Sequence, residues 1–247
     1  MTEPVRDTLI SARDNCRMFD QIAPRYDLIN SVMSLGLHRF WRRRAVHHLL
    51  SRTGHIFLDV GCGTGEISLA VARHAPNAQV TAIDPSREML HIAESKTIKA
   101  GLDGRIAYQT GDATALPFSH ATFDGIVCAF CLRNITNRAT ALREMRRVLR
   151  PGGTLAILEL TAPLHPFPKA VHRLHTRRII PLIGRLLSQG SAYHYLADSI
   201  DHFPPAAEIV NELVTAGFPD ACQESLTGGF VTLFTEASFG SPNFQKE

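Results

Sequence analysis

Residues 58–65, Leu-Asp-Val-Gly-Cys-Gly-Thr-Gly, restrict the fold of this chain more than any other segment. An apolar run leads into them, and a helical pattern follows the last glycine. A buried strand that turns sharply into a helix explains this order, because residues without a Cβ atom tolerate the turn. Such a turn lets a ligand lie against backbone amides at a helix N-terminus. The candidate ligand contacts are Asp59, Gly61, Gly63, Thr64 and Gly65. A glycine-rich turn that binds no ligand is the alternative.

The spacing of the glycines favours one class of ligand over another. Dinucleotide sites use G-x-G-x-x-G, with the pyrophosphate at the helix N-terminus. This chain has G-x-G-x-G instead, preceded by the carboxylate of Asp59. A carboxylate repels a pyrophosphate but suits a cationic ligand, such as the sulfonium and amino groups of S-adenosylmethionine.

Acidic residues also follow the next two predicted strands. Residues 79–84 end in Asp84, whose carboxylate can accept hydrogen bonds from both hydroxyls of a ribose. An N-cap for the helix that starts near Ser86 is the alternative role. The strand over 105–110 runs into Asp112, which can accept from an adenine amine, although Gly-Asp is also common in turns. The side chains that could flank the adenine ring are Met89, Ala113 and Leu116.

With these residues the chain resembles the class I S-adenosylmethionine-dependent methyltransferases. Residues 26–41, which begin Tyr-Asp-Leu-Ile-Asn and end Arg-Phe-Trp, resemble the N-terminal signature of the ubiquinone/menaquinone C-methyltransferase family. Residues 147–159 resemble the second signature of that family, and residues 132–136 and 193–204 also fit. The resemblance runs from about residue 19 to residue 236, and the first signature is specific for the family.

The resemblance implies S-adenosylmethionine as cofactor, S-adenosylhomocysteine as product and a lipophilic quinol as substrate, with demethylmenaquinol first and a ubiquinol precursor second. It adds Tyr26 and Ala129 to the cofactor side. The departures are small: Ile29 stands in place of Met, Thr161 in place of Ser, and Ala129 where some relatives carry Ser. Two alternatives are a methyltransferase that acts on another lipophilic small molecule and a non-catalytic scaffold of a quinone-biosynthesis complex. A homodimer is also compatible with the sequence.

Strand and helix patterns alternate through the middle of the chain and predict a doubly wound α/β fold. The resemblance implies a seven-stranded sheet of order 3-2-1-4-5-7-6, with strand 7 antiparallel. Strands are expected near residues 56–60, 79–83, 105–110, 123–128, 154–160, 219–226 and 229–236, and helices near 65–75, 86–100, 137–149 and 205–216. We expect one domain whose core, residues 51–162, binds the cofactor. An N-terminal helical cap over 1–50 precedes this core, and a helical substrate-side insertion over 163–204 follows it. The closing helix and strands occupy residues 205–237, and residues 238–247 form a frayed tail.

The composition is that of one globular domain with a large core, at 247 residues and 45% apolar. No apolar run approaches the roughly 20 residues that span a bilayer, and no signal pattern opens the chain, so we expect a cytoplasmic protein.

The five cysteines are scattered, and Cys128 and Cys131 form a lone C-x-x-C without the second pair of a zinc site. We therefore expect reduced thiols and no metal.

Two segments contain basic residues but no acid. Residues 29–57 hold five arginines and residues 161–197 hold four arginines and one lysine, whereas the net charge of the chain is only +3. Solvated helix faces are the simple explanation. Because apolar residues such as Phe40 and Trp41 lie among the cations, a transient contact with an anionic membrane surface is the more specific hypothesis.

We expect no nucleic-acid binding, because no nucleic-acid motif accompanies the charge. The histidines at 165, 172 and 175 match no known metal spacing.

The resemblance places Arg133 and Asn134, just after the fourth strand, on the acceptor side of the site. A quinol ring donates electrons better as its hydroxyl deprotonates, and we expect these two residues to hold the oxyanion or a water that removes the proton. Arginine itself hardly takes a proton, because its pKa exceeds about 12. A salt bridge from Arg133 to a nearby acid such as Asp124 is the alternative.

Tyr26 and Asp27 are expected in a lid over the cofactor, with helix packing and capping as the alternative. His38 and Trp41 could belong to the lid or to the core, and the sequence does not decide between them.

Overall fold

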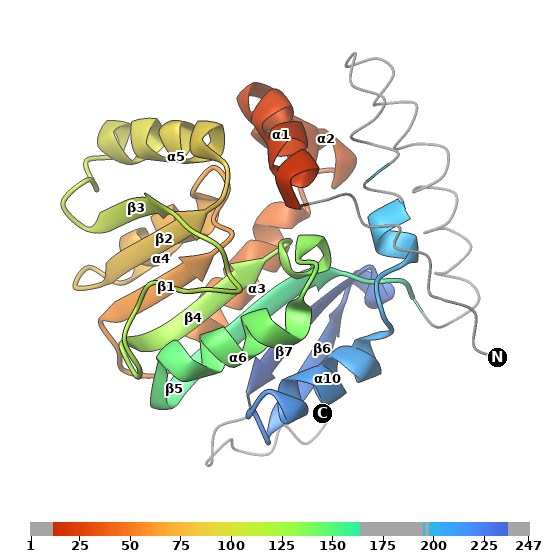
Figure 1. Cartoon of the computed structure of the whole chain (residues 1–247). Helices are drawn as coiled ribbons and strands as arrows, with labels where there is room; N and C mark the ends of the chain where they lie inside the picture. The colour runs from red at the N-terminus through yellow and green to blue at the C-terminus, as the bar shows by residue number, and fades with distance from the viewer. Residues whose placement is uncertain (1–11, 164–194, 196–197, 237–247) are drawn as a thin grey trace, which may run out of the picture.

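The computed structural model describes residues 12–163, 195 and 198–236, and its seven strands form one sheet of order β3-β2-β1-β4-β5-β7-β6 (Figure 1). Strands β1 to β5 are parallel where they pair, and β7 runs antiparallel between β5 and β6. The order and the direction of strand 7 confirm the prediction. The strands are β1 Ile56–Val60, β2 Gln79–Asp84, β3 Ile106–Thr110, β4 Phe123–Ala129, β5 Leu149–Leu160, β6 Ala221–Leu226 and β7 Val231–Glu236.

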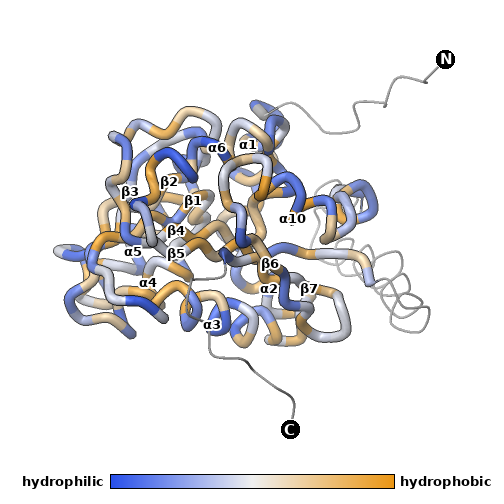
Figure 2. Tube along the Cα trace, turned by 90° about the horizontal axis from the view of Figure 1, so that it is seen from below, coloured by the Kyte–Doolittle hydropathy of each residue, from blue (hydrophilic) through white to orange (hydrophobic). Residues whose placement is uncertain are grey.

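Helices cover both faces of this sheet. On one face α3 and α4 bury Trp41, Val46 and Val71 against the strands, and on the other α6 and α10 bury Met145 and Leu213. Figure 2 shows the hydrophobic colouring concentrated in the central strands, as expected for strands buried on both faces. The helices are α1 Ala12–Ile22, α2 Tyr26–Met33, α3 His38–Leu49, α4 Glu66–His74, α5 Arg87–Lys99, α6 Arg138–Val148 and α10 Ala206–Thr215, with short 3-10 turns η1 Ala23–Arg25, η2 Leu132–Asn134 and η4 Thr227–Gly229.

Two breaks divide the described N-terminal segment into three helices. Pro24 lies in η1, which separates α1 from α2. Leu35 and Gly36 both have positive φ and separate α2 from α3. At the other end of the described chain, η4 with Gly228 and Gly229 joins β6 to β7 in an antiparallel hairpin.

Strand β5 begins five residues earlier than expected. The sequence predicted a helix to residue 149 and a strand from residue 154, but Leu149 already pairs with Phe123. The register then shifts between Phe123 and Gly125, so the Pro-Gly-Gly segment bulges out of the ladder and does not end it.

The expected insertion over 163–204 and the expected tail over 238–247 fall largely outside the described residues. Of the insertion, Tyr195 and residues 198–201 are described and helical. The basic residues and the histidines at 165, 172 and 175 predicted there also lie outside the described parts. Among the helices that are described, none is long and apolar enough to cross a bilayer.

Candidate functional site

A cavity of about 280 Å³ opens where strands β1 to β4 end, next to α1 and the start of α2. Ligand sites of open parallel sheets lie at this carboxyl edge. The cavity brings together nine of the predicted site residues: Tyr26, Gly61, Gly63, Asp84, Met89, Asp112, Ala113, Ala129 and Asn134. Asp59, Thr64, Gly65 and Arg133 are not among the described residues that line it.

The glycine turn needs its glycines for space as well as for backbone conformation. Gly61 has φ +67°, and a Cβ atom there would lie 2.2 Å from the sulfur of Cys131. Gly65 has φ +77°, and a Cβ atom there would lie 2.5 Å from the Tyr108 hydroxyl. Larger side chains would clash at both positions, so Gly61 leaves bare backbone at the cavity wall and Gly65 lets the turn pack against Tyr108.

Asp84 lies at the tip of β2 and is almost fully buried. Its Oδ2 accepts a hydrogen bond from the Gly63 amide at 2.8 Å, and its Oδ1 accepts from the Ser86 amide at 2.9 Å. Burial raises the pKa of Asp84 to about 6, although these two hydrogen bonds oppose the shift. The N-cap of α5 is Ser86, whose hydroxyl accepts from the Met89 amide, so the alternative role of Asp84 as N-cap is wrong.

Asp59 is buried beneath the same turn. Its Oδ2 accepts from the amide and the hydroxyl of Ser68, at 3.1 and 2.6 Å. Its Oδ1 is buried and has no hydrogen-bond partner in the described structure. Burial raises the pKa of this carboxyl to about 6. A buried oxygen without a donor is costly, so the base of the turn fits a ligand that brings N–H groups, such as the ammonium of S-adenosylmethionine.

Asp112 is exposed at the rim of the cavity, and it makes the local turn contacts that Gly-Asp sequences favour. Its Oδ1 accepts from the amide and the hydroxyl of Thr114, both at 2.8 Å. The turn therefore fixes one carboxylate oxygen, and Oδ2 accepts from no described residue.

Helix α2 is fastened to the glycine turn through Asp27. Its Oδ1 accepts from the Thr64 hydroxyl at 2.6 Å, and its Oδ2 pairs with the Lys96 ammonium of α5 at 2.9 Å. Lys96 also pairs with Glu66 at the start of α4. The preceding residue, Tyr26, lines the cavity. Sequence reasoning singled out Tyr26 and Asp27 but not Lys96, because nothing local in the sequence links α5 to α2.

His38 and Trp41 are core residues. The Ser34 hydroxyl and His38 Nδ1 are 2.7 Å apart, and burial lowers the pKa of this histidine. Trp41 donates from its indole nitrogen to the Thr227 hydroxyl at 2.8 Å, and its ring meets that of Phe130 edge to face. Helix α3 is thereby attached to η4 and to the end of β4.

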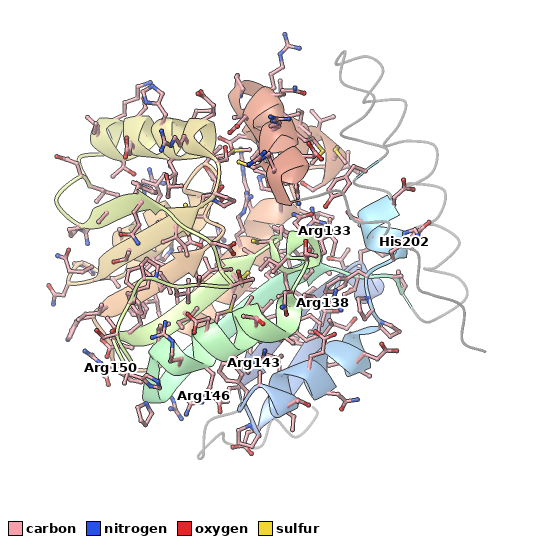
Figure 3. All side chains as sticks on the ribbon, in the orientation of Figure 1. Arg133, Arg138, Arg143, Arg146, Arg150 and His202 are labelled. Atoms are coloured by element: carbon pink, nitrogen blue, oxygen red, sulfur yellow. The ribbon has the colours of Figure 1, made fainter. Side chains whose placement is uncertain are left out.

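Arg133 is buried and forms an ion pair with Glu159, not with Asp124. Its Nη1 donates to Glu159 Oε1 at 2.6 Å and to the Phe130 carbonyl at 2.7 Å, and its backbone amide donates to Glu159 Oε2 at 3.0 Å. Burial alone would lower the pKa of Arg133. The nearby Glu159 carboxylate acts in the opposite direction, and the net result is that the pKa of Arg133 is raised. Asp124 pairs instead with Arg150, which lies far from Arg133 along the sheet (Figure 3).

A polar cluster missed by sequence reasoning joins α1 to η2 at the cavity wall. Asn15 donates from Nδ2 to the Asn134 carbonyl and to the Tyr195 hydroxyl, both at 3.2 Å. Tyr195 donates to Asn134 Oδ1 at 3.1 Å, and burial raises the pKa of its phenol, so the hydroxyl stays protonated. Asn15 Oδ1 is buried without a partner in the described structure. No local pattern marks Asn15, because its partners lie 119 and 180 residues away.

Four of the five cysteines lie in the glycine turn, in the cavity wall or in β4. Cys16 and Cys131 line the cavity, and Cys128 is buried in β4. Burial raises the pKa of Cys62, so this thiol stays protonated. Over the described ranges, no group of three His, Cys, Asp or Glu side chains is arranged to hold a metal ion.

Known structures share this fold. The [4+2]-cyclase SpnF superposes with a TM-score of 0.68 at 23% identity, covering 90% of this chain and 77% of that one. Phosphoethanolamine N-methyltransferase 2 of Haemonchus contortus, solved with S-adenosyl-L-methionine, gives 0.64 at 22% identity over 92% of this chain and 49% of that one. At such identities the likeness shows the fold alone.

Sequence relatives are much closer. The ubiquinone/menaquinone biosynthesis C-methyltransferase UbiE of Syntrophotalea carbinolica is 41% identical over 90% of this chain and 93% of its own length. The demethylmenaquinone methyltransferase of Porphyromonas gingivalis is 39% identical, over 88% of this chain and 89% of its own. The profile of the ubiE/COQ5 methyltransferase family matches residues 9–237. The chain belongs to the ubiE/COQ5 methyltransferase family and is an S-adenosylmethionine-dependent methyltransferase.

Proposed function

We propose that the protein methylates a ring carbon of a polyprenylated quinol, with demethylmenaquinol as the first candidate and a demethylated ubiquinol precursor as the second. The observation that carries this proposal is the identity of about 40%, over nearly nine tenths of the chain, to relatives named as quinone C-methyltransferases. The cavity supports it, because its wall is mostly apolar and carries a small number of polar groups, as ligand pockets do.

The cofactor end of the cavity is the glycine turn with its three carboxylates. Asp84 and Asp112 line the cavity and would accept from the ribose hydroxyls and the adenine amine. Asp59 lies beneath the turn and outside the described cavity wall, and its orphaned Oδ1 would accept from the ammonium if the turn admits it. Met89 and Ala113 would flank the adenine ring. Tyr26 and Ala129 would complete the cavity wall around the cofactor. Thr64 would contribute indirectly, because its hydroxyl donates to Asp27 of helix α2.

The acceptor end is the cluster around η2. S-adenosylmethionine supplies an electrophilic methyl group, so the protein has mainly to align the acceptor carbon and exclude water. Asn134 Oδ1 is taken by Tyr195, which leaves Nδ2 to donate toward an acceptor oxygen in the cavity. Arg133 precedes Asn134 in η2, outside the described cavity wall, and its charge is balanced by Glu159. We assign it to positioning Asn134 and to stabilising the developing phenolate electrostatically.

The redox state of the acceptor tests the proposal. A quinol hydroxyl pushes electrons onto the ring carbon, whereas an oxidised quinone is electron-poor there. With a short-tailed demethylnaphthoquinol and labelled S-adenosylmethionine, we expect product only when a reductant is present. Methylation of the oxidised quinone at the same rate would contradict the mechanism, and cofactor binding without turnover on any quinol would indicate a scaffold.

A further inference from the structure

Helix α2, the turn after it and the start of α3 expose a continuous set of large apolar side chains. Leu35 is 86% exposed and Phe40 54% exposed. Five of the seven exposed large hydrophobic residues in the described structure lie within these 13 positions; the other two, Ile98 and Val214, are isolated on α5 and α10. We call this set the α2–α3 patch; it consists of Leu28, Val32, Leu35, Leu37 and Phe40.

The core does not need these side chains. Leu28 and Val32 are four residues apart and lie on the exposed side of α2, whereas Ile29 and Met33 occupy the buried side. Leu35 adopts φ +49° at the turn, a left-handed conformation that is uncommon for residues other than glycine. A strained and almost fully exposed leucine next to four other exposed hydrophobic residues indicates a contact surface.

The charges beside the patch specify an anionic partner. Arg39 and Arg43 lie on the exposed side of α3, and no carboxylate of the described structure pairs with either. Their neighbours are engaged: Arg44 pairs with Glu224 at 3.0 Å, and the Arg42 guanidinium lies 5.8 Å from the centre of the Phe130 ring. Because residues 29–57 contain no acid, nothing within this segment neutralises Arg39 and Arg43.

We propose that the α2–α3 patch docks on an anionic lipid bilayer, with its apolar side chains in the interface and Arg39 and Arg43 at the headgroups. Apolar residues flanked by unpaired cations are the pattern of interfacial helices. The patch begins two residues after Tyr26, which lines the cavity. If the acceptor is a prenylated quinol, as proposed above, docking here would bring the cavity close to the membrane that holds it.

Sedimentation with vesicles tests the proposal without cofactor or quinol, and therefore independently of the proposed function. The vesicles are phosphatidylglycerol mixed with phosphatidylcholine, compared with pure phosphatidylcholine, at about 0.1 and 1 M salt. One variant removes apolar contact, L35S/F40S, and one removes charge, R39Q/R43Q. The matched controls are Ile98→Ser, an exposed apolar residue elsewhere, and R73Q/R87Q, which changes the net charge equally at exposed positions of α4 and α5.

We expect R39Q/R43Q to weaken binding to anionic vesicles about fivefold for each arginine, because a cation near such a surface contributes about 1 kcal/mol. L35S/F40S should weaken binding about tenfold or more, and both controls should bind like the parent. Circular dichroism melts and turnover on a short-tailed acceptor without vesicles confirm that each variant is folded. Absence of vesicle binding by the parent, or equal losses in the controls, would overturn the proposal. So would a concentration-dependent dimer that L35S/F40S abolishes while vesicle binding persists, since the patch would then join two copies.

Discussion

The carboxylates at the strand ends make the most direct predictions at the scale of single residues. Asp84 could be assigned from the sequence, because a strand pattern that ends in an acid fixes where the residue lies in an open sheet. Its backbone donors, Gly63 and Ser86, became visible only in the folded chain. Asp84→Ala removes the acceptor of two charge-assisted hydrogen bonds, each worth roughly 1.5–3 kcal/mol. Calorimetric titration should show S-adenosylhomocysteine binding weakened about 100-fold or more, and NAD should not bind the parent. Unchanged affinity in the variant would contradict the assignment.

The same carboxylates predict how cofactor affinity depends on pH. The pKa values of Asp59 and Asp84 are raised by burial to about 6, above the ordinary value near 4, so the free protein keeps their protons until the pH exceeds about 6. A ligand that donates hydrogen bonds or carries positive charge binds the ionised forms. Affinity should therefore fall as the pH drops from 7 to 5, by up to about tenfold per unit for each carboxylate. Calorimetry across this range should give a shallower slope for Asp84→Asn, and an equal slope would exclude Asp84 from the linkage.

Tyr195 gives a test of the acceptor end. Tyr195→Phe keeps the ring but removes the hydroxyl that joins Asn15 to Asn134, leaving Asn134 Oδ1 without its donor. We expect turnover to fall about tenfold or more while cofactor affinity changes little, because the orientation of Asn134 is lost. The matched control is Tyr108→Phe, which removes a hydroxyl bonded to Thr97 and not among the described groups of the cavity wall. Equal losses of turnover in both variants would indicate a general effect on stability.

At the scale of elements, the fastening of α2 to the glycine turn predicts how the cofactor is retained. Asp27→Asn keeps an acceptor for Thr64 but breaks the ion pair with Lys96. Partly exposed ion pairs contribute about 0.2–1 kcal/mol, so S-adenosylhomocysteine should dissociate about two- to fivefold faster in stopped-flow measurements. Arg44→Gln, which breaks the pair between α3 and β6, is the control and should leave the rate unchanged. If Asp27→Asn behaves like this control, α2 packs on the turn without retaining the ligand.

Elements with strong local signals were predictable, and those that depend on distant contacts were not. The helices over residues 66–74, 87–99 and 138–148 lie within one residue of their expected ends, because apolar periodicity and capping residues mark them. The early start of β5 was missed, because Leu149 becomes a strand residue only by pairing with Phe123. The partner of Arg133 was missed for the same reason: Glu159 lies 26 residues away on β5.

At the scale of the whole molecule, the alternation of strands and helices predicted a doubly wound sheet with its site at the carboxyl edge, and the family resemblance predicted the strand order. The wall residues of α1, and the hydrogen bond from Asn15 of that helix to Tyr195, were not predictable, since these two segments lie outside the alternation and 180 residues apart. The strand ends and η2 thus supply the proposed cofactor and acceptor groups, and segments outside the alternation add Asn15, Tyr26 and Tyr195 around them. Our central claim is that these two ends act together in methyl transfer to a quinol.

The most direct test is single-turnover transfer of labelled methyl from S-adenosylmethionine to a short-tailed demethylnaphthoquinol under reductant, comparing the parent with Arg133→Ala and Arg133→Lys. We predict ring-methylated product from the parent, a rate about tenfold or more lower for Arg133→Ala because Arg133 acts through Asn134, and partial recovery for Arg133→Lys, with cofactor affinity nearly unchanged. Cofactor binding and circular dichroism melts show whether each variant is folded. No quinol methylation by the parent, or a normal rate in folded Arg133→Ala, would contradict the account.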